Sequence, residues 1–197
     1  YRGAAPINWA IINGEKVSGV TTFKLTHEID TGNILLQRKV DIDHKETAGG
    51  LHDKLMIAGA ELLIETIDGL IAGKIHEQPQ SMVEGKVTHA PKIFTETCNI
   101  DWNKCCEEIY NLIRGLSPFP GAFTQLQGKI FKIYRAEKYC TLNYPMPGTL
   151  ETDYKSYMRF GCSDGYIYAK EIQAEGKKRM LIEEFLRGFR QNNTHGV

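Results

Sequence analysis

The change in hydrophobic pattern across residues 73–98 constrains this chain more than any other feature of its sequence. The stretch keeps no sustained period and contains Pro79 and Pro91, which is typical of a linker or of an irregular excursion over a surface. Helical spacing precedes it, and short alternating runs follow it. We therefore expect two units, residues 1–72 and residues 99–197, joined by residues 73–98.

The first unit combines helix and strand. Pro6 stands at the first turn of a short apolar helix, and Thr47 can cap a long amphipathic helix that keeps its spacing to about residue 71. Between them, two runs rich in β-branched residues, 20–25 and 34–40, predict strands. The pattern favours an α/β unit that closes with a helix.

The second unit is predicted to be mostly strand. A helix is expected over residues 101–114, with Gly115 as its end. Short alternating runs separated by turn residues then predict strands over residues 122–127, 130–134, 157–162 and 166–172, with a closing helix over residues 182–189. Short strands with one small helix fit a little β-barrel.

Charge is distributed unevenly although the net charge is zero, with 24 Lys and Arg against 24 Asp and Glu. Residues 1–98 carry 10 basic and 13 acidic side chains, a net of −3, whereas residues 99–197 carry 14 and 11, a net of +3. The asymmetry indicates an anion or a nucleic acid as partner of the second unit; chance is the alternative. No apolar run reaches the roughly 18 residues that a membrane-spanning helix needs, so no membrane partner is expected.

The five cysteines are odd in number and form no C-x-x-C motif. This argues against a disulfide framework and against a zinc ribbon. We expect free thiols, no metal, and a reducing, cytoplasmic setting.

Two sets of residues could carry chemistry or binding. Asp30, in Asp30-Thr31-Gly32, lies between the two predicted strands of the first unit, where a fixed carboxylate could transfer protons; ordinary turn sequence is the alternative. In the second unit, basic residues are interleaved with aromatic ones, which favours a surface that follows a nucleic-acid backbone; a solvated face over an aromatic core is the alternative. These basic residues are Lys129, Lys132, Arg135, Lys177, Lys178 and Arg179, of which Lys129, Lys177, Lys178 and Arg179 are the candidate contacts.

Several segments spread along the chain belong together. They are Arg2-Gly3-Ala4-Ala5-Pro6-Ile7, Ile29-Asp30-Thr31-Gly32, Ala90-Pro91-Lys92-Ile93, Ile113-Arg114-Gly115 with Pro118-Phe119-Pro120-Gly121, and Gly176-Lys177-Lys178-Arg179-Met180. In this order, the set resembles the corresponding segments of the methionyl-tRNA formyltransferase family, and it spans nearly the whole chain.

The resemblance implies a fold, a reaction and a set of site residues. The fold would be the later part of a Rossmann-like α/β formyltransferase domain, followed by a small OB-like β-barrel domain that binds tRNA. The reaction would move a formyl group from 10-formyltetrahydrofolate to the amine of methionine on initiator tRNA, without a metal. Asp30 would be the catalytic acid. The folate would contact His27, Glu28, Ile29 and Asp30, and the tRNA would contact Arg114, Lys129, Lys177, Lys178 and Arg179.

One part of the family pattern is not found in the sequence. The family's Asn-x-His pair and S-L-L-P loop would precede Tyr1. We therefore expect that this chain does not formylate on its own, and that its partner is the amino-terminal part of the same enzyme. Two other functions stay open: a tRNA-binding module without catalysis, and a formyltransferase that acts on a small amine such as an amino sugar.

Overall fold

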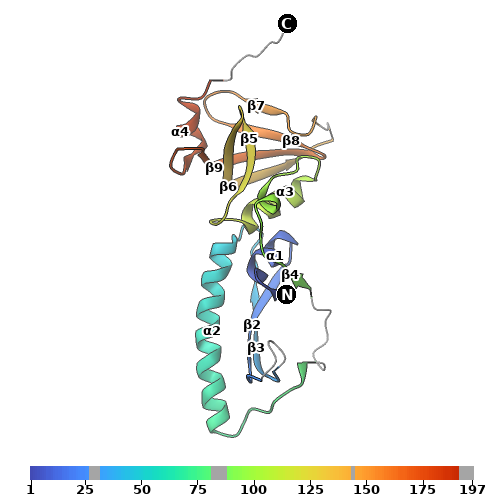
Figure 1. The fold of residues 1–197 in the computed structure, drawn as a ribbon, viewed down its shortest axis with the longest axis vertical. Helices are drawn as coiled ribbons and strands as arrows, with labels where there is room; N and C mark the ends of the chain where they lie inside the picture. Colours follow the sequence, from blue (N-terminus) through green and yellow to red (C-terminus); the bar gives the residue numbers. More distant parts are fainter. Residues whose placement is uncertain (27–31, 81–87, 143–144, 191–197) are drawn as a thin grey trace.

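The computed structural model describes residues 1–26, 32–80, 88–142 and 145–190. It has two units, each with its own hydrophobic core. The helices α1 and α3 lie between the sheet of the second unit and the strands of the first (Figure 1). Among the described residues, no helix combines the length and the apolar character that crossing a membrane requires.

The first unit is a small α/β layer. It contains β1 (Arg2–Gly3), α1 (Pro6–Ile12), β2 (Val17–Phe23), β3 (Ile34–Asp41) and α2 (Ala48–Ile71). The strands β2 and β3 form an antiparallel pair, which packs against α2. As the sequence predicts, Thr47 caps α2: its hydroxyl oxygen accepts a hydrogen bond from the Gly50 N–H at 3.1 Å.

The helix α2 has a buried apolar face and further apolar side chains that are exposed. Leu51, Leu55 and Leu62 are buried against the unit. Large apolar side chains along the same helix stay exposed, among them Ile57 at 59% and Ile64 at 62% of their surface. A helix that is apolar on two sides usually has a neighbour on each of them.

The linker is less irregular than its composition predicts. It contains β4 (His89–Ala90), which pairs in parallel with β1, and a 3₁₀ turn, η2 (Glu96–Cys98). Gly3 makes this pairing possible, since a Cβ atom at that position would lie 2.2 Å from the Ala90 carbonyl oxygen.

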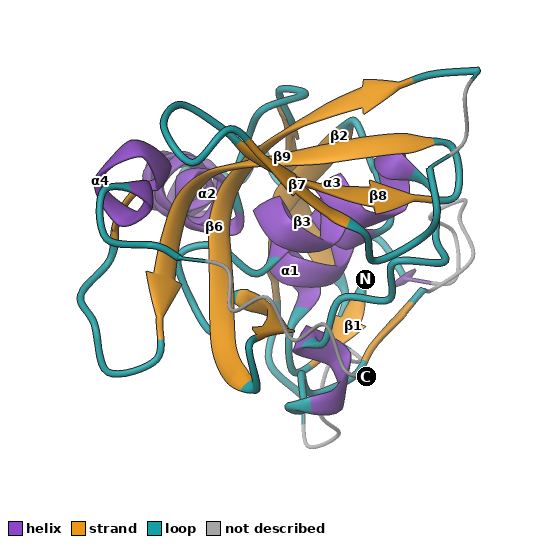
Figure 2. Cartoon of the chain, turned by 90° about the horizontal axis from the view of Figure 1, so that it is seen from above, coloured by secondary structure: helices purple, strands orange, loops and turns teal. Residues whose placement is uncertain are grey.

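The second unit is a curled antiparallel sheet with helices packed against it (Figure 2). Its elements are α3 (Cys106–Gly115), β5 (Ala122–Leu126), β6 (Lys129–Cys140), β7 (Leu150–Thr152), β8 (Met158–Cys162), β9 (Gly165–Ala174), β10 (Met180–Leu181) and α4 (Ile182–Leu186). The strand order is β5-β6-β9-β8-β7, with β10 added at β9. Within the described residues this path does not pair β7 with β5, so the structure shows a mixed α/β fold with a curled sheet and does not establish the closed barrel that we expected.

The predicted and observed bounds of the first helix in this unit differ. The helix α3 begins at Cys106 rather than at residue 101. Asp101 instead forms a turn, in which its carboxylate accepts a hydrogen bond from the Asn103 N–H at 3.0 Å. Cys105 and Glu108 then form the capping box that starts the helix.

The two units touch directly. The Asn8 amide donates a hydrogen bond to the Gly115 carbonyl oxygen at 2.8 Å, and the Gly49 N–H donates one to the Ser117 carbonyl oxygen at 3.0 Å. The Trp9 ring N–H donates to the Pro91 carbonyl oxygen at 2.8 Å and so fixes the linker to α1. These bonds hold the second unit and the linker against the start of the first unit.

Candidate functional site

The segment that carries Asp30 lies outside the described residues, together with His27, Glu28 and Ile29. The residues on either side of it are described. Lys24 and Asn33 both donate hydrogen bonds to the Glu77 carboxylate, at 2.6 Å and 3.0 Å. The hydrogen bond from Lys24, followed by that from Asn33, lowers the pKa of Glu77. Lys24 and Asn33, which stand before and after the Asp30 segment in the sequence, thus bind one anionic side chain.

A second set of contacts links Gly32 to the start of the chain through Gln80. The Gln80 amide donates a hydrogen bond to the Gly32 carbonyl oxygen at 2.7 Å, and its oxygen accepts one from the Arg2 guanidinium at 2.8 Å. Gln80 therefore connects two segments that the sequence analysis singled out separately.

A cleft of about 480 Å³ lies between the two units and the linker. Its walls are mostly apolar. The lining residues are Ala4, Ala5 and Asn8 from the first unit, Lys92, Ile93, Phe94, Thr95 and Cys98 from the linker, and Phe119, Pro120, Gly121, Phe123, Ile130 and Lys132 from the second unit. Small side chains at Ala4 and Ala5 keep the cleft open next to the Arg2 segment.

The cleft carries two cations and two exposed rings. The Lys92 ammonium lies 5.8 Å from the centre of the Phe94 ring, and the Lys132 ammonium donates a hydrogen bond to the Pro120 carbonyl oxygen at 2.9 Å. Phe94 is 57% exposed and Phe119 is 80% exposed. Ammonium groups can bind phosphates, and exposed aromatic rings beside them can stack on bases.

Three of the predicted basic residues gather at one end of the sheet. Lys129 is exposed at the turn between β5 and β6, and Lys177 and Lys178 are exposed at the turn between β9 and β10. The two turns are neighbours, because the Glu175 carboxylate accepts a hydrogen bond from the Ile130 N–H at 2.9 Å.

Arg179 is held more firmly than these lysines. Its guanidinium donates two hydrogen bonds to the Glu171 carboxylate, at 2.6 Å and 2.9 Å, and stacks 4.3 Å from the centre of the Tyr134 ring. The hydrogen bonds from Arg179 lower the pKa of Glu171. Part of the charge of Arg179 is therefore neutralised within the unit.

Arg114 is placed apart from the other predicted cations. Its side chain is buried between the units, at 7% exposure. The guanidinium donates to the Asn111 side-chain oxygen at 2.8 Å and to the Glu46 carbonyl oxygen at 3.1 Å, and burial lowers its pKa. In this structure Arg114 joins α3 to the segment before α2 rather than facing solvent.

The sequence pattern predicts no role for Lys92, Phe94 or Phe119, and Lys132 enters it only as one of the basic residues interleaved with aromatic ones. Lys92 and Phe119 do belong to the segments quoted for the family resemblance, next to prolines that stiffen the chain. Their convergence on one cleft depends on the packing of the units, which no local pattern contains. Among the described residues, the close group with metal-ligand chemistry is Cys106, Cys140 and Asp164, which does not line this cleft.

These features define a class: a two-unit α/β protein with a cleft between its units. Comparison with known families makes this specific. The model for "Formyl transferase" matches residues 1–67, and that for "Formyl transferase, C-terminal domain" matches residues 92–190. The chain belongs to the formyl transferase family, and the resemblance found in its sequence is confirmed.

The curated relatives that cover almost the whole chain share one name. A methionyl-tRNA formyltransferase of Phocaeicola vulgatus is 45% identical over 205 residues, which cover 100% of this chain and 63% of that protein. One of Parabacteroides distasonis is 48% identical over 200 residues, covering 97% and 61%. The chain thus spans about three fifths of the length of these curated relatives. Among solved structures, HypX from Aquifex aeolicus in complex with tetrahydrofolic acid shares the fold, with a TM-score of 0.71 at 20% identity over 97% of this chain and 34% of that one.

Proposed function

We propose that this chain is the later part of a methionyl-tRNA formyltransferase, which moves a formyl group from 10-formyltetrahydrofolate to the amine of methionine on initiator tRNA. The observation that carries the proposal is the family match along both units, with relatives of that name at 45% and 48% identity. The tetrahydrofolic acid bound in the HypX structure, which shares this fold, supports a folate as the formyl donor.

Asp30 is the catalytic acid of the proposal. The neutral amine attacks the formyl carbon, the bond from that carbon to the folate nitrogen breaks, and the nitrogen regains a proton. A carboxylate beside the reacting groups can take the proton from the attacking amine and support its transfer, which is worth about 10²–10⁴-fold in rate. The segment His27, Glu28, Ile29 and Asp30 would supply polar groups to the folate. The described residues that flank it, Lys24, Gly32 and Asn33, are hydrogen-bonded to Glu77 and Gln80.

The cleft between the units suits the end of a tRNA. Lys92 and Lys132 could neutralise phosphates, while Phe94 and Phe119 could stack on unpaired bases. Ala4 and Ala5, which follow Arg2 in the chain, line this cleft, and Arg2 is hydrogen-bonded to Gln80, which also donates to the Gly32 carbonyl oxygen.

The second unit would hold the remainder of the tRNA. We take residues 99–197 as the OB-like tRNA-binding domain, residues 1–72 as the later part of the catalytic domain and residues 73–98 as the linker. The curled antiparallel sheet, the net charge of +3 and the exposed Lys129, Lys177 and Lys178 support this role. An enzyme for an amino sugar has no use for such a cationic surface.

The chain spans about three fifths of the length of the curated relatives, and activity would also need the remainder, which the proposal places on the amino-terminal side. The pair β2–β3 is a two-stranded sheet, which is marginal without further cover. The exposed apolar side of α2, represented by Ile57, Ile64 and Ile71, offers a surface for that cover. The proposal assigns this surface to the amino-terminal part of the same enzyme.

A complementation assay tests the proposal. Formyl transfer to methionyl initiator tRNA is measured for the chain alone and after mixing with the amino-terminal part of the Phocaeicola vulgatus relative. We expect no turnover by the chain alone, turnover by the mixture, and a loss of about 10²–10⁴-fold for Asp30→Asn.

Asp41→Asn is the matched control, because Asp41 is an exposed acid at the end of β3; it should leave turnover unchanged. Full activity of the Asp30→Asn mixture would remove Asp30 from the mechanism. A folded mixture that formylates an amino sugar but not the tRNA would show that the proposed substrate is wrong.

A further inference from the structure

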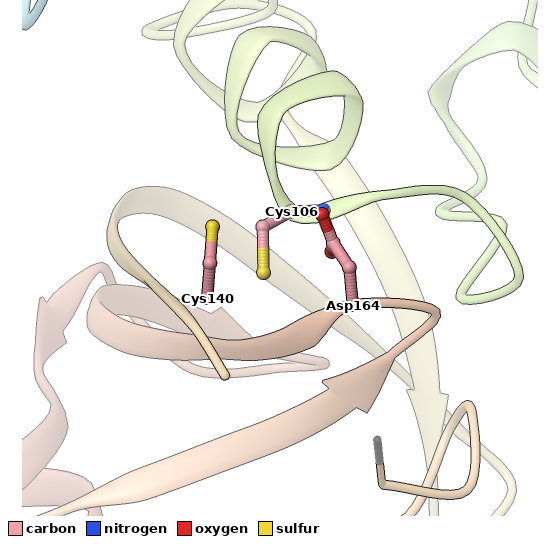
Figure 3. Close-up of side chains that lie close together, drawn as sticks. All are labelled: Cys106, Cys140 and Asp164. Atoms are coloured by element: carbon pink, nitrogen blue, oxygen red, sulfur yellow. The ribbon is translucent and has the colours of Figure 1, made fainter. Parts of the chain in front are cut away.

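Three thiols and a carboxylate come together on the side of the second unit where α3 begins. The possible ligand atoms of Cys106, Cys140 and Asp164 all lie within 4.8 Å of one another. Figure 3 shows Cys106 at the start of α3, between Cys140 at the end of β6 and Asp164 in the turn between β8 and β9. A third thiol adjoins them, since the Cys162 sulfur lies 3.1 Å from the Cys106 sulfur.

The fold sets these positions through strand register. Gly165 pairs with Cys140 on one side and with Cys162 on the other, so the two cysteines flank one level of β9. Asp164 precedes Gly165, and its carboxylate accepts a hydrogen bond from the Cys106 N–H at 2.6 Å. A Cβ atom at residue 165 would lie 3.0 Å from the Cys106 sulfur, so glycine lets the helix start approach the strand.

Burial explains part of this cluster but not all of it. Cys106 and Cys162 are fully buried and can serve as small apolar side chains. Cys140 is exposed and gains nothing from such packing. The Asp164 carboxylate accepts the Cys106 N–H at the helix start, and as a carboxylate it is also a possible metal ligand.

The donor set has a clear chemical preference. Thiolates select borderline and soft cations, and a carboxylate is an accepted companion ligand of Zn²⁺. Mg²⁺ and Ca²⁺ require shells of oxygen ligands, which two sulfurs do not provide.

We propose that Cys106, Cys140 and Asp164 form a binding site for a soft divalent cation of the Zn²⁺ type. Two sulfur–metal bonds form as the two S–H protons pass to solvent, the carboxylate supplies the third ligand, and no electron is transferred. Exposure of Cys140 provides the entry path and leaves a position for water. The bound cation would join α3 to β6 and to the turn between β8 and β9. The site is independent of the cleft and of formyl transfer.

Cobalt is the probe, because Co²⁺ replaces Zn²⁺ and absorbs light when bound to thiolates. Co²⁺ is titrated into the full chain, kept reduced with a phosphine, and is then displaced with Zn²⁺. We expect thiolate-to-metal charge-transfer absorption and the visible bands of tetrahedral Co²⁺, both lost on addition of Zn²⁺. At a free Zn²⁺ concentration of about 100 times Kd, the melting temperature should rise by roughly 5–10 °C.

Cys140→Ser is the decisive variant, because Cys140 is exposed and its replacement leaves the core intact. It should weaken Co²⁺ binding by at least about tenfold, the loss expected even for an outer partner of a metal site. Asp164→Asn, which retains the oxygen that caps Cys106, should also weaken it.

Two matched thiols serve as controls. The Cys105 thiol is directed at Glu108, and the buried Cys98 thiol donates to the Phe94 carbonyl oxygen at 3.3 Å. Cys105→Ser and Cys98→Ser should bind Co²⁺ as the parent chain does. Absence of thiolate absorption in the parent, or unchanged binding in a folded Cys140→Ser variant, would overturn the proposal.

Discussion

Burial decides what a basic side chain can do, as Arg114 illustrates. The residue was selected from the sequence for its charge and its place in a resembling segment, but its guanidinium lies between the units and is 7% exposed. Two acceptors, the Asn111 side-chain oxygen and the Glu46 carbonyl oxygen, depend on it. Its described contacts are structural ones.

Replacing Arg114 with methionine keeps most of the volume and removes both hydrogen bonds. The free energy of unfolding should fall by about 2–3 kcal/mol, because the two acceptors are left in a buried setting. Urea denaturation measures the change. The control is Arg187→Met on the exposed end of α4, which should alter stability by less than about 0.5 kcal/mol. An Arg114→Met chain of parental stability that binds tRNA more weakly would return Arg114 to the binding surface.

Elements that follow from local rules were predictable, and those that follow from packing were not. The cap at Thr47 and the spacing after it located α2, and β-branched runs located β2 and β3. The strands β7 and β10 are only three and two residues long, too short to show a period. The hydrogen bonds of Asp101 stabilise a turn in place of the first helical turn, so α3 begins at Cys106.

The cysteine cluster and the cleft could not be predicted, because each forms from residues that are far apart in the sequence. Cys106 and Asp164 are 58 residues apart and meet only because a helix start docks on a strand turn. Motif spacing, which excluded a zinc ribbon, could not reveal such a group. The cleft has the same origin, since Lys92 and Lys132 belong to the linker and to β6.

The helix α2 offers a paired test of how the units fit. An added Cβ at Gly49 would lie 2.6 Å from the Pro118 Cδ atom, whereas one at Gly59 would make an ordinary contact with Val20 at 3.7 Å. Alanine at either position gains about 0.5–1 kcal/mol of helix stability. Gly59→Ala should therefore be neutral or stabilising.

Gly49→Ala should lose about 1–3 kcal/mol, because its methyl group is forced against the rigid proline ring of the other unit. Thermal unfolding of both variants measures the difference. A Gly49→Ala chain at least as stable as Gly59→Ala would show that the contact between α2 and Pro118 can shift without cost.

At the scale of the whole molecule, charge separates between two units that are in contact. The first half carries a net of −3 and the second a net of +3, and the hydrogen bonds of Asn8 and Gly49 hold the units together. The positive second unit would therefore attract a polyanion, and the negative first unit would repel it. Under the proposed function, such a layout would orient a tRNA along the molecule before any specific contact forms.

The salt dependence of tRNA binding separates contacts from solvated charge. Each phosphate neutralised by a lysine adds about 0.9 to the slope of log K against log salt concentration. The double variant Lys177→Ala/Lys178→Ala should bind more weakly and lower this slope by about two, measured by fluorescence anisotropy over a salt series. Lys16→Ala, an exposed lysine of the negatively charged first unit, should leave the slope unchanged. Equal slopes for the double variant and the parent chain would mean that Lys177 and Lys178 face solvent in the complex, and the cationic contacts would then have to lie in the cleft, at Lys92 and Lys132.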